Sequence, residues 1–192
     1  MKTLASWVLA AALAGCSSPQ AVRFHTLLPS DTPPVAAPAA SPIAWELLPI
    51  GMAPSVSQPQ LVVRAGDDTL AVLEQERWIA PLADELRAAV AERLAQRVGR
   101  PPPGNARWRI RVDVLRFESV PQGYARLVAD WELRSTSGVA FAASCRGVFD
   151  EPATAGINGV VAAHRRAAQR LADAIADALL ALNDARVVAC PK

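Results

Sequence analysis

Apolar residues recur at every third or fourth position in two stretches of the chain, and this spacing predicts two amphipathic helices. The first begins near Pro81, a residue suited to a first helical turn, and ends before Gly99 and Pro101. The second runs from Ile157 to Leu182. Each helix therefore needs a partner surface that covers its apolar stripe. The stripe of the first helix consists of Leu82, Leu86, Val90, Leu94 and Val98.

Apolar and polar residues alternate in the middle of the chain, which is typical of half-buried strands. Short turns separate the alternating segments, so they predict an antiparallel meander. The phase slips at residues 115–117, where we expect a bulge or a strand end. Cys145 falls on the apolar side of the third segment. The three segments are 107–114, 125–134 and 139–145.

Shorter strands are predicted at 44–50, 60–64 and 69–73, and a glycine-containing turn joins the last two. Residues 22–28 are a further candidate strand. Strands and helices with one apolar face each are assembled most economically as an α+β fold. We therefore expect a mainly antiparallel sheet with two long helices packed on one face.

The start of the chain has the charge and hydropathy of an export signal. Lys2 is followed by the almost unbroken apolar run 3–14, which is shorter than the ~20 residues of a bilayer span. The next residues, Leu13-Ala-Gly-Cys16, resemble the bacterial lipobox, in which the cysteine is acylated and the chain is cut before it. The alternative is an ordinary secretory peptide with a chance cysteine. The resemblance implies that 1–15 is a cleaved signal peptide and that a covalent lipid on Cys16 anchors the chain.

The region after Cys16 is rich in proline, and nine of the sixteen prolines lie between Pro19 and Pro59. Residues 16–43 are therefore predicted to be a lipid anchor and Pro/Ala-rich tether, and residues 44–192 the α+β domain. Inner-membrane retention in enterobacterial lipoproteins usually shows Asp after the cysteine. Ser17 at that position favours the periplasmic face of the outer membrane, again by resemblance.

Composition excludes some functions. A chain that is 52% hydrophobic and 20% charged is not wholly disordered, and a net charge of +2 argues against an extended surface for nucleic acid or for an anionic membrane. Two cysteines, Cys145 and Cys190, remain beside Cys16, and an oxidising periplasm favours a disulfide between them. The alternative is one buried thiol and one free thiol near the terminus. The sequence has no Cys-x-x-Cys spacing that would indicate a redox pair.

Motifs for catalysis or metal binding are missing from the sequence, so we expect neither an enzyme nor a metal site. His164 lies on the apolar stripe of the last helix and is interpreted as a core or boundary imidazole, whereas His25 has no partner motif. The acidic pair at 67–68 lies in a predicted turn. Asp173 and Asp177 lie on a helix face. Both pairs are interpreted as solvated charges rather than acid–base pairs.

Arginines alternate along the polar side of the central strands. They are suited to binding an acidic protein or lipid headgroups. Asp113, Asp130 and Glu132 are interleaved with them, so cross-strand ion pairs on a wet sheet face are the simpler interpretation. The arginines are Arg107, Arg109, Arg111, Arg126 and Arg134.

The combination of lipobox, Pro-rich segment, central meander and last helix resembles the ABC-type transport auxiliary lipoprotein family, the PqiC/YmbA-like lipoproteins. The most specific part is the opening of the first helix. Its motif positions are Arg77, Trp78, Pro81 and Leu82, with structural roles for Trp78 and Pro81. The early aromatic motif of the family is matched only loosely, by Phe24-His-Thr-Leu27.

The resemblance implies a non-enzymatic auxiliary subunit of an ABC/MCE-type intermembrane lipid transport system. It implies docking to a periplasm-spanning MCE-domain protein, with inner-membrane transporter components as further partners. The only cofactor-like group would be the lipid on Cys16. A homo-oligomer would suit such docking. The alternatives are an envelope lipoprotein that scaffolds another complex, a periplasmic module that binds an amphiphile, and an anchored hydrolase.

Overall fold

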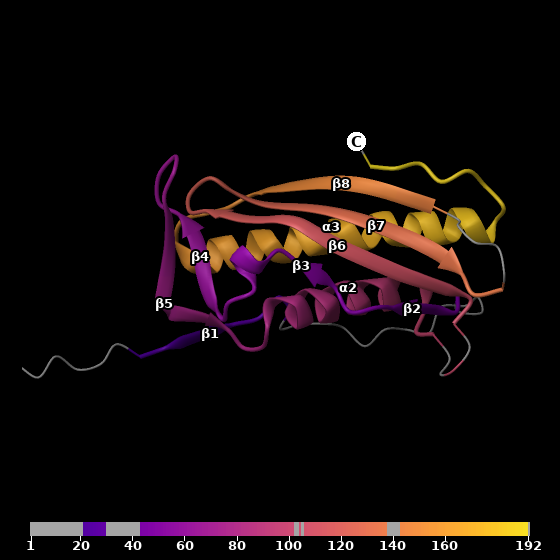
Figure 1. Ribbon diagram of the computed structural model, residues 1–192, viewed down its shortest axis with the longest axis horizontal. Helices are drawn as coiled ribbons and strands as arrows, with labels where there is room; N and C mark the ends of the chain where they lie inside the picture. Colours follow the sequence, from indigo (N-terminus) through magenta and orange to yellow (C-terminus); the bar gives the residue numbers. More distant parts are fainter. Residues whose placement is uncertain (1–20, 30–42, 102–103, 105, 138–142, 192) are drawn as a thin grey trace, which may run out of the picture.

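The computed structural model describes residues 21–29, 43–101, 104, 106–137 and 143–191. The predicted signal peptide, Cys16 and most of the predicted tether lie outside the described residues. Within them the chain forms two sheets and two long helices, arranged along one elongated axis (Figure 1). The predicted α+β fold with a mainly antiparallel sheet and two helices on one face is confirmed.

The larger sheet is built on the predicted meander. Strands β6 (Trp108–Val120), β7 (Tyr124–Ser135) and β8 (Ala143–Pro152) pair antiparallel in sequence order. Two short strands, β2 (Trp45–Leu47) and β3 (Gly51–Met52), pair with β6 in parallel. Strand β8 extends past the predicted end at Cys145, because alternate residues remain buried as far as Phe149.

The predicted phase slip is a bulge in β6. The register against β7 shifts between Val114 and Arg116. The extra residue, Leu115, is exposed on the outer side, and Phe117 returns to the buried side of the strand. The bulge thus places Phe117 where it can pack on both His164 and Trp78.

The sequence predicts one sheet, and the described residues form two. Strands β4 (Gln60–Arg64) and β5 (Leu70–Trp78) form the predicted hairpin, and β1 (Arg23–His25) pairs parallel to β5. This smaller sheet stands across one end of the molecule (Figure 1). A single-turn 3-10 helix, η1 (Pro54–Val56), precedes β4. The residues that sequence analysis offered as a candidate strand thus contribute β1.

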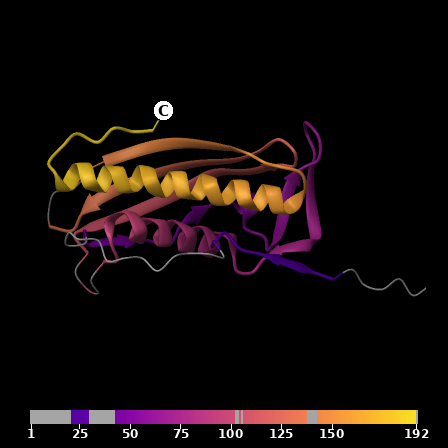
Figure 2. The same ribbon diagram turned by 180° about the vertical axis from the view of Figure 1, so that it is seen from behind.

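Helices α2 (Leu82–Val98) and α3 (Gly156–Asn183) lie side by side on one face of the larger sheet (Figure 2). Pro81 occupies the N-cap position of α2, and its carbonyl oxygen accepts the N–H groups of Asp84 and Glu85. Gly99 ends α2 with a φ of 83°, a conformation that favours glycine. The apolar stripes of both helices are buried against the sheet and each other. Side chains with no exposed area include Leu86, Val90, Leu94, Leu171, Ile175 and Leu179.

Candidate functional site: attachment of the amino-terminal segment

Two buried carboxylates hold the amino-terminal segment, residues 21–29, to the domain. The first is Glu85, in the first turn of α2, with only 5% of its surface exposed. Its Oε2 atom accepts the Thr26 hydroxyl at 2.7 Å and the Leu27 backbone N–H at 2.8 Å. A negative charge is also favourable at this end of a helix. These bonds fix the chain just after β1, and Leu27 is completely buried beside them.

The second carboxylate is Glu76, on β5, which is 4% exposed. The register pairs Arg23 with Glu76, and the Arg23 guanidinium forms an ion pair with Oε1. The Nε2 atom of His25 lies 2.6 Å from Oε2. Burial raises the pKa of Glu76, but the hydrogen bonds and charges of Arg23 and His25 together lower it below the ordinary 4.5. Glu76 is therefore a buried anion stabilised by β1.

Helix α3 supplies a third attachment. The Arg165 guanidinium donates to the backbone carbonyl oxygens of Leu27, at 3.2 Å, and Thr26, at 3.1 Å. Residues 26–27 thus contact α2 through Glu85 and α3 through Arg165. The backbone of β1 pairs with β5, and the Ile79 N–H donates to the His25 carbonyl oxygen at 2.9 Å. The amino-terminal segment is thus built into the fold by three separate elements, β5, α2 and α3.

His164 is a core residue, as predicted. It has no exposed surface, its ring stacks on Phe117 with centroids 3.7 Å apart, and Nε2 lies 2.9 Å from the Ser119 hydroxyl. Nδ1 has no partner among the described residues. Burial lowers the pKa of His164 from 6.5 to about 3, so the imidazole is neutral at physiological pH.

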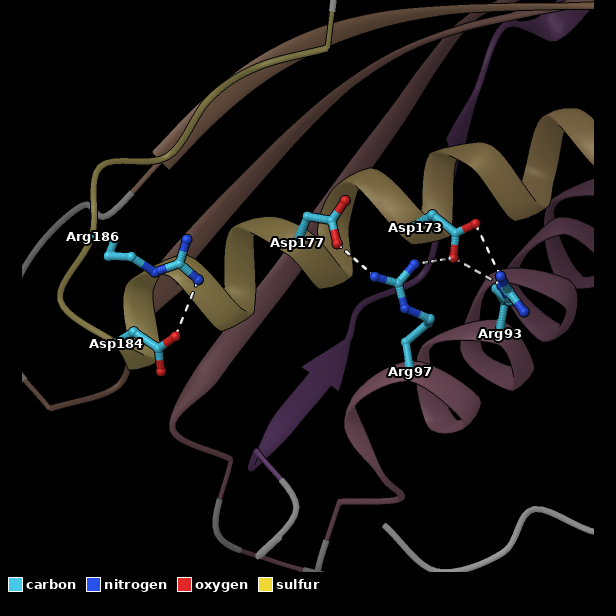
Figure 3. Close-up of polar contacts among 6 residues, drawn as sticks. All are labelled: Arg93, Arg97, Asp173, Asp177, Asp184 and Arg186. Atoms are coloured by element: carbon cyan, nitrogen blue, oxygen red, sulfur yellow. Dashed lines mark hydrogen bonds and ion pairs between the residues drawn. The ribbon is translucent and has the colours of Figure 1, made fainter. Parts of the chain in front are cut away.

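The helix carboxylates interpreted as solvated charges are instead ion-paired between the two helices (Figure 3). Arg93 makes a two-pronged contact with Asp173, at 2.8 and 3.1 Å. Arg97 bridges Asp173 at 2.8 Å and Asp177 at 2.6 Å. Asp173 and Asp177 are one helical turn apart, as are Arg93 and Arg97 on α2. The sequence pattern of α3 alone did not reveal these arginine partners.

Four of the five arginines on the outer sheet face are ion-paired with carboxylates, and the predicted cross-strand pairing is confirmed for two of them. Cross-strand pairs join Arg126 to Asp150 at 2.7 Å and Arg109 to Glu46 at 3.2 Å. Arg111 and Arg134 instead contact acidic residues two positions away on their own strands. The guanidinium of Arg107 lies 5.6 Å from the ring centroid of Trp108.

The carboxy-terminal tail is joined to β8. Cys145 and Cys190 form a disulfide, with Cα atoms 5.4 Å apart and a sequence separation of 45. Cys145 is buried under the sheet edge. The Pro191 side chain approaches Gly147 on the same strand. The bond therefore holds the segment after α3 against β8.

The family-motif residues surround the junction of β5 and α2. Trp78 is 4% exposed and meets Phe117 edge-on, with centroids 6.2 Å apart. Leu82 is buried at the start of α2. The Arg77 Nε–H donates to the Glu74 carbonyl oxygen at 3.3 Å. Glu76 precedes this junction and Glu85 follows it, and both contact the amino-terminal segment.

The described part of the chain shows neither a metal-binding cluster nor a membrane-spanning helix. There, no group of three or more His, Cys, Asp or Glu side chains is arranged to hold a metal ion. Neither helix in the same residues has the length and hydropathy that a bilayer span needs. Glu76, Glu85 and Arg165 were missed by sequence reasoning. The sequence carried only a weak indication that the two glutamates are buried. Glu76 lies on the same side of its strand as Trp78, and Glu85 lies beside the apolar stripe of α2.

The fold and this attachment define a class of protein: an α+β domain that incorporates an amino-terminal segment, residues 21–29. A model of the family described as ABC-type transport auxiliary lipoprotein component matches residues 25–176, and the chain belongs to that family. The match begins within β1. The family description makes the chain a lipoprotein that assists ABC-type transport components.

Solved structures share the fold. A Xanthomonas campestris protein of the DUF330 family superposes with a TM-score of 0.64 at 21% identity, covering 80% of this chain and 95% of its own. An uncharacterised protein also gives 0.64, at 12% identity, covering 82% of this chain and 97% of its own. No curated protein matches the chain.

Proposed function

We propose that this protein is a non-enzymatic lipoprotein on the periplasmic face of the outer membrane, anchored by a lipid on Cys16. It acts as an auxiliary subunit of an ABC/MCE-type intermembrane lipid transport system. Its part is to dock the periplasm-spanning MCE-domain protein. The observation that carries this proposal is the family match over residues 25–176, which names an auxiliary lipoprotein of ABC-type transport.

The attachment of residues 21–29 supports a docking role. A docking subunit must hold its partner at a defined distance from the membrane, so the link between its lipid anchor and its folded domain must be short. Only residues 17–22 separate Cys16 from β1, and a chain of that length reaches at most about 25 Å. A free tether over 16–43 would reach about 100 Å. The three contacts of the segment with β5, α2 and α3 support the short link, which would keep the domain close to the membrane that holds the lipid.

A groove favours the amphiphile-binding module as a second candidate. It lies between β2, α2 and the loop after α2 and has a volume of about 580 Å³, within the range of small-molecule sites. Trp45, Leu47 and Ala91 give it apolar walls, and Arg87 and Arg109 add positive charge. Lipid that remains bound to the protein through purification and washing would favour this function.

The anchor is tested by fractionation of cells that express the wild type or Cys16→Ala. The wild type should sediment with outer membrane and carry acyl chains by intact mass. The variant should lose the acyl mass and leave the membrane fraction. Cys190→Ala is the matched control, because it also removes a thiol but retains the lipobox. Sedimentation of Cys16→Ala with outer membrane would contradict the anchor.

The docking role is tested by crosslinking in cells at native abundance. A tag after Lys192 allows purification in detergent, and mass spectrometry identifies what is bound. The proposal expects an MCE-domain protein and inner-membrane transporter components, both reduced for Cys16→Ala. An unrelated outer-membrane lipoprotein with the same tag controls for abundance. Recovery of the wild type alone would contradict docking, and recovery of another envelope complex would identify a scaffold.

A further inference from the structure

Large apolar side chains are exposed on and beside β1. This strand belongs to the smaller sheet, which lies at one end of the molecule (Figure 1). Phe24 and Ile79 are each 59% exposed, and Val22 is 41% exposed. Apolar side chains gathered on a surface mark a site of contact with another molecule or a membrane. The neighbouring residues of β1 are, by contrast, engaged in the attachment described above.

Strand alternation separates the two sides of β1. Arg23 and His25 point to the buried Glu76. Successive side chains of a strand point to opposite faces, so Phe24 and Val22 lie on the other, open side. Strand β1 thus anchors itself by one face and, together with the preceding Val22, presents apolar groups on the other.

The register of β1 on β5 brings Arg77 and Ile79 close to Phe24. Phe24 is aligned with Arg77, so their side chains share a face of the smaller sheet. Ile79 follows Arg77 by two positions, and its N–H continues the pairing by donating to the His25 carbonyl oxygen. Ile79 is therefore diagonal to Phe24. The surface combines an aromatic ring, aliphatic groups and a guanidinium.

The short link between Cys16 and β1 indicates which partner covers this surface. Residues 17–22 reach about 25 Å at most, so an acylated Cys16 keeps this end of the domain beside the bilayer. Aromatic and aliphatic side chains next to arginine suit the headgroup region of a membrane, where apolar groups enter and cations meet phosphate. A protein partner would have to enter the space between domain and lipid.

We propose that Val22, Phe24 and Ile79, with Arg77 beside them, form a bilayer-contacting surface. Its occupant is the phospholipid surface of the membrane that holds the Cys16 lipid. The inference rests on the proposed function for the acylation of Cys16 and for nothing else. It orients the molecule: the smaller sheet faces the lipid, and the far end of the long axis, where α2 and α3 end, points away (Figures 1 and 2).

Photo-crosslinking of the full acylated chain tests this surface. The photoreactive residue p-benzoylphenylalanine replaces Phe24 or Ile79 in protein reconstituted into vesicles of phosphatidylethanolamine and phosphatidylglycerol. Matched controls carry it in place of Val148, 45% exposed on β8, or Val187, 94% exposed after α3. Illumination followed by intact mass measurement should give at least about tenfold more phospholipid adduct at the first two positions than at the controls.

Intact mass also separates the two proposals. An acylated, vesicle-bound protein with equal adduct at all four positions would overturn the contact surface and leave the anchor standing. Adducts of twice the protein mass at Phe24 or Ile79 would show a second copy there and would also overturn it. A chain without acyl mass would contradict the anchor, and the chain-length argument would fall with it.

Discussion

The backbone N–H of Leu27 donates a 2.8 Å hydrogen bond to the carboxylate of Glu85, a residue 58 positions later in the sequence. Both groups are buried. Removal of the acceptor leaves the N–H and the Thr26 hydroxyl without this partner. We therefore expect Glu85→Ala to lower the free energy of unfolding by about 1–3 kcal/mol. Urea unfolding measures it, with Glu74→Ala, an exposed glutamate on β5, as the control.

The same variant should release the segment locally. Trypsin cleavage after Arg23 should be faster in Glu85→Ala than in wild type under native conditions, because the attachment must open before the protease can bind. Glu85→Gln retains an oxygen acceptor and should lie between the two. Equal cleavage of Glu85→Ala and wild type would show that Glu85 does not hold the segment.

The ionised Glu76 carboxylate should make the free energy of unfolding depend on pH in the acidic range. Its pKa is lowered in the fold, so its contribution is present above the ordinary 4.5 and is lost as the pH falls through the lower folded value. Wild type should exceed Glu76→Gln in stability at pH 7, and this difference should shrink below pH 4. Unfolding at several pH values measures it. A difference that is constant with pH would mean that the ionised form is not stabilised.

His164 should impose a second pH dependence at higher pH. The unfolded chain binds a proton near pH 6.5, whereas the buried ring binds one only near pH 3. Stability should therefore fall with decreasing pH between these values, by about 1.4 kcal/mol per pH unit from this group. His164→Leu should lack this slope between pH 4.5 and 6. Ser119→Ala keeps the imidazole and should retain the slope at lower stability.

Asp173 and Asp177, which join the two helices, should contribute unequally to the free energy of unfolding (Figure 3). Asp173 accepts hydrogen bonds from both arginines and is 29% exposed at its side chain, whereas Asp177 accepts one and is 66% exposed. We expect a loss of about 1–2 kcal/mol for Asp173→Ala and at most about 0.5 kcal/mol for Asp177→Ala. Asp184→Ala, whose pair with Arg186 joins no second helix, is the control.

The disulfide should be present in the exported protein. Reduction should add the mass of two hydrogens, and Cys190→Ser should lose up to about 4 kcal/mol of stability, the loop-entropy value for this separation. Reduced wild type should unfold at the same denaturant concentration as Cys190→Ser. A mass that does not change on reduction would show that the thiols are free.

Periodicity was sufficient to predict the helices and the meander, because Leu86 or Val112 must face the core whatever the tertiary partners are. It was insufficient for the smaller sheet. Parallel pairing of β1 with β5 joins residues about fifty positions apart, and three residues carry too little pattern to specify a partner. The bulge in β6 was predictable because it changes the phase of the alternation itself.

The attachment site was not predictable for a different reason. A glutamate on a strand or in the first turn of a helix is usually solvated, and nothing in the local sequence distinguishes Glu76 or Glu85 from such residues. Their burial follows from the arrival of a distant segment that supplies donors. Asp173 was misread in the same way, since its arginine partners lie on another helix.

Incorporation of residues 23–28 into the domain is tested most directly by amide hydrogen exchange on the acylated protein in vesicles. The Leu27 amide, bonded to Glu85, should exchange about as slowly as the amides of β5, and faster in Glu85→Ala. Exchange of wild-type Leu27 at the rate of an unstructured peptide would contradict it. The chain between lipid and domain would then be the long tether, and the domain would not be held at the membrane surface.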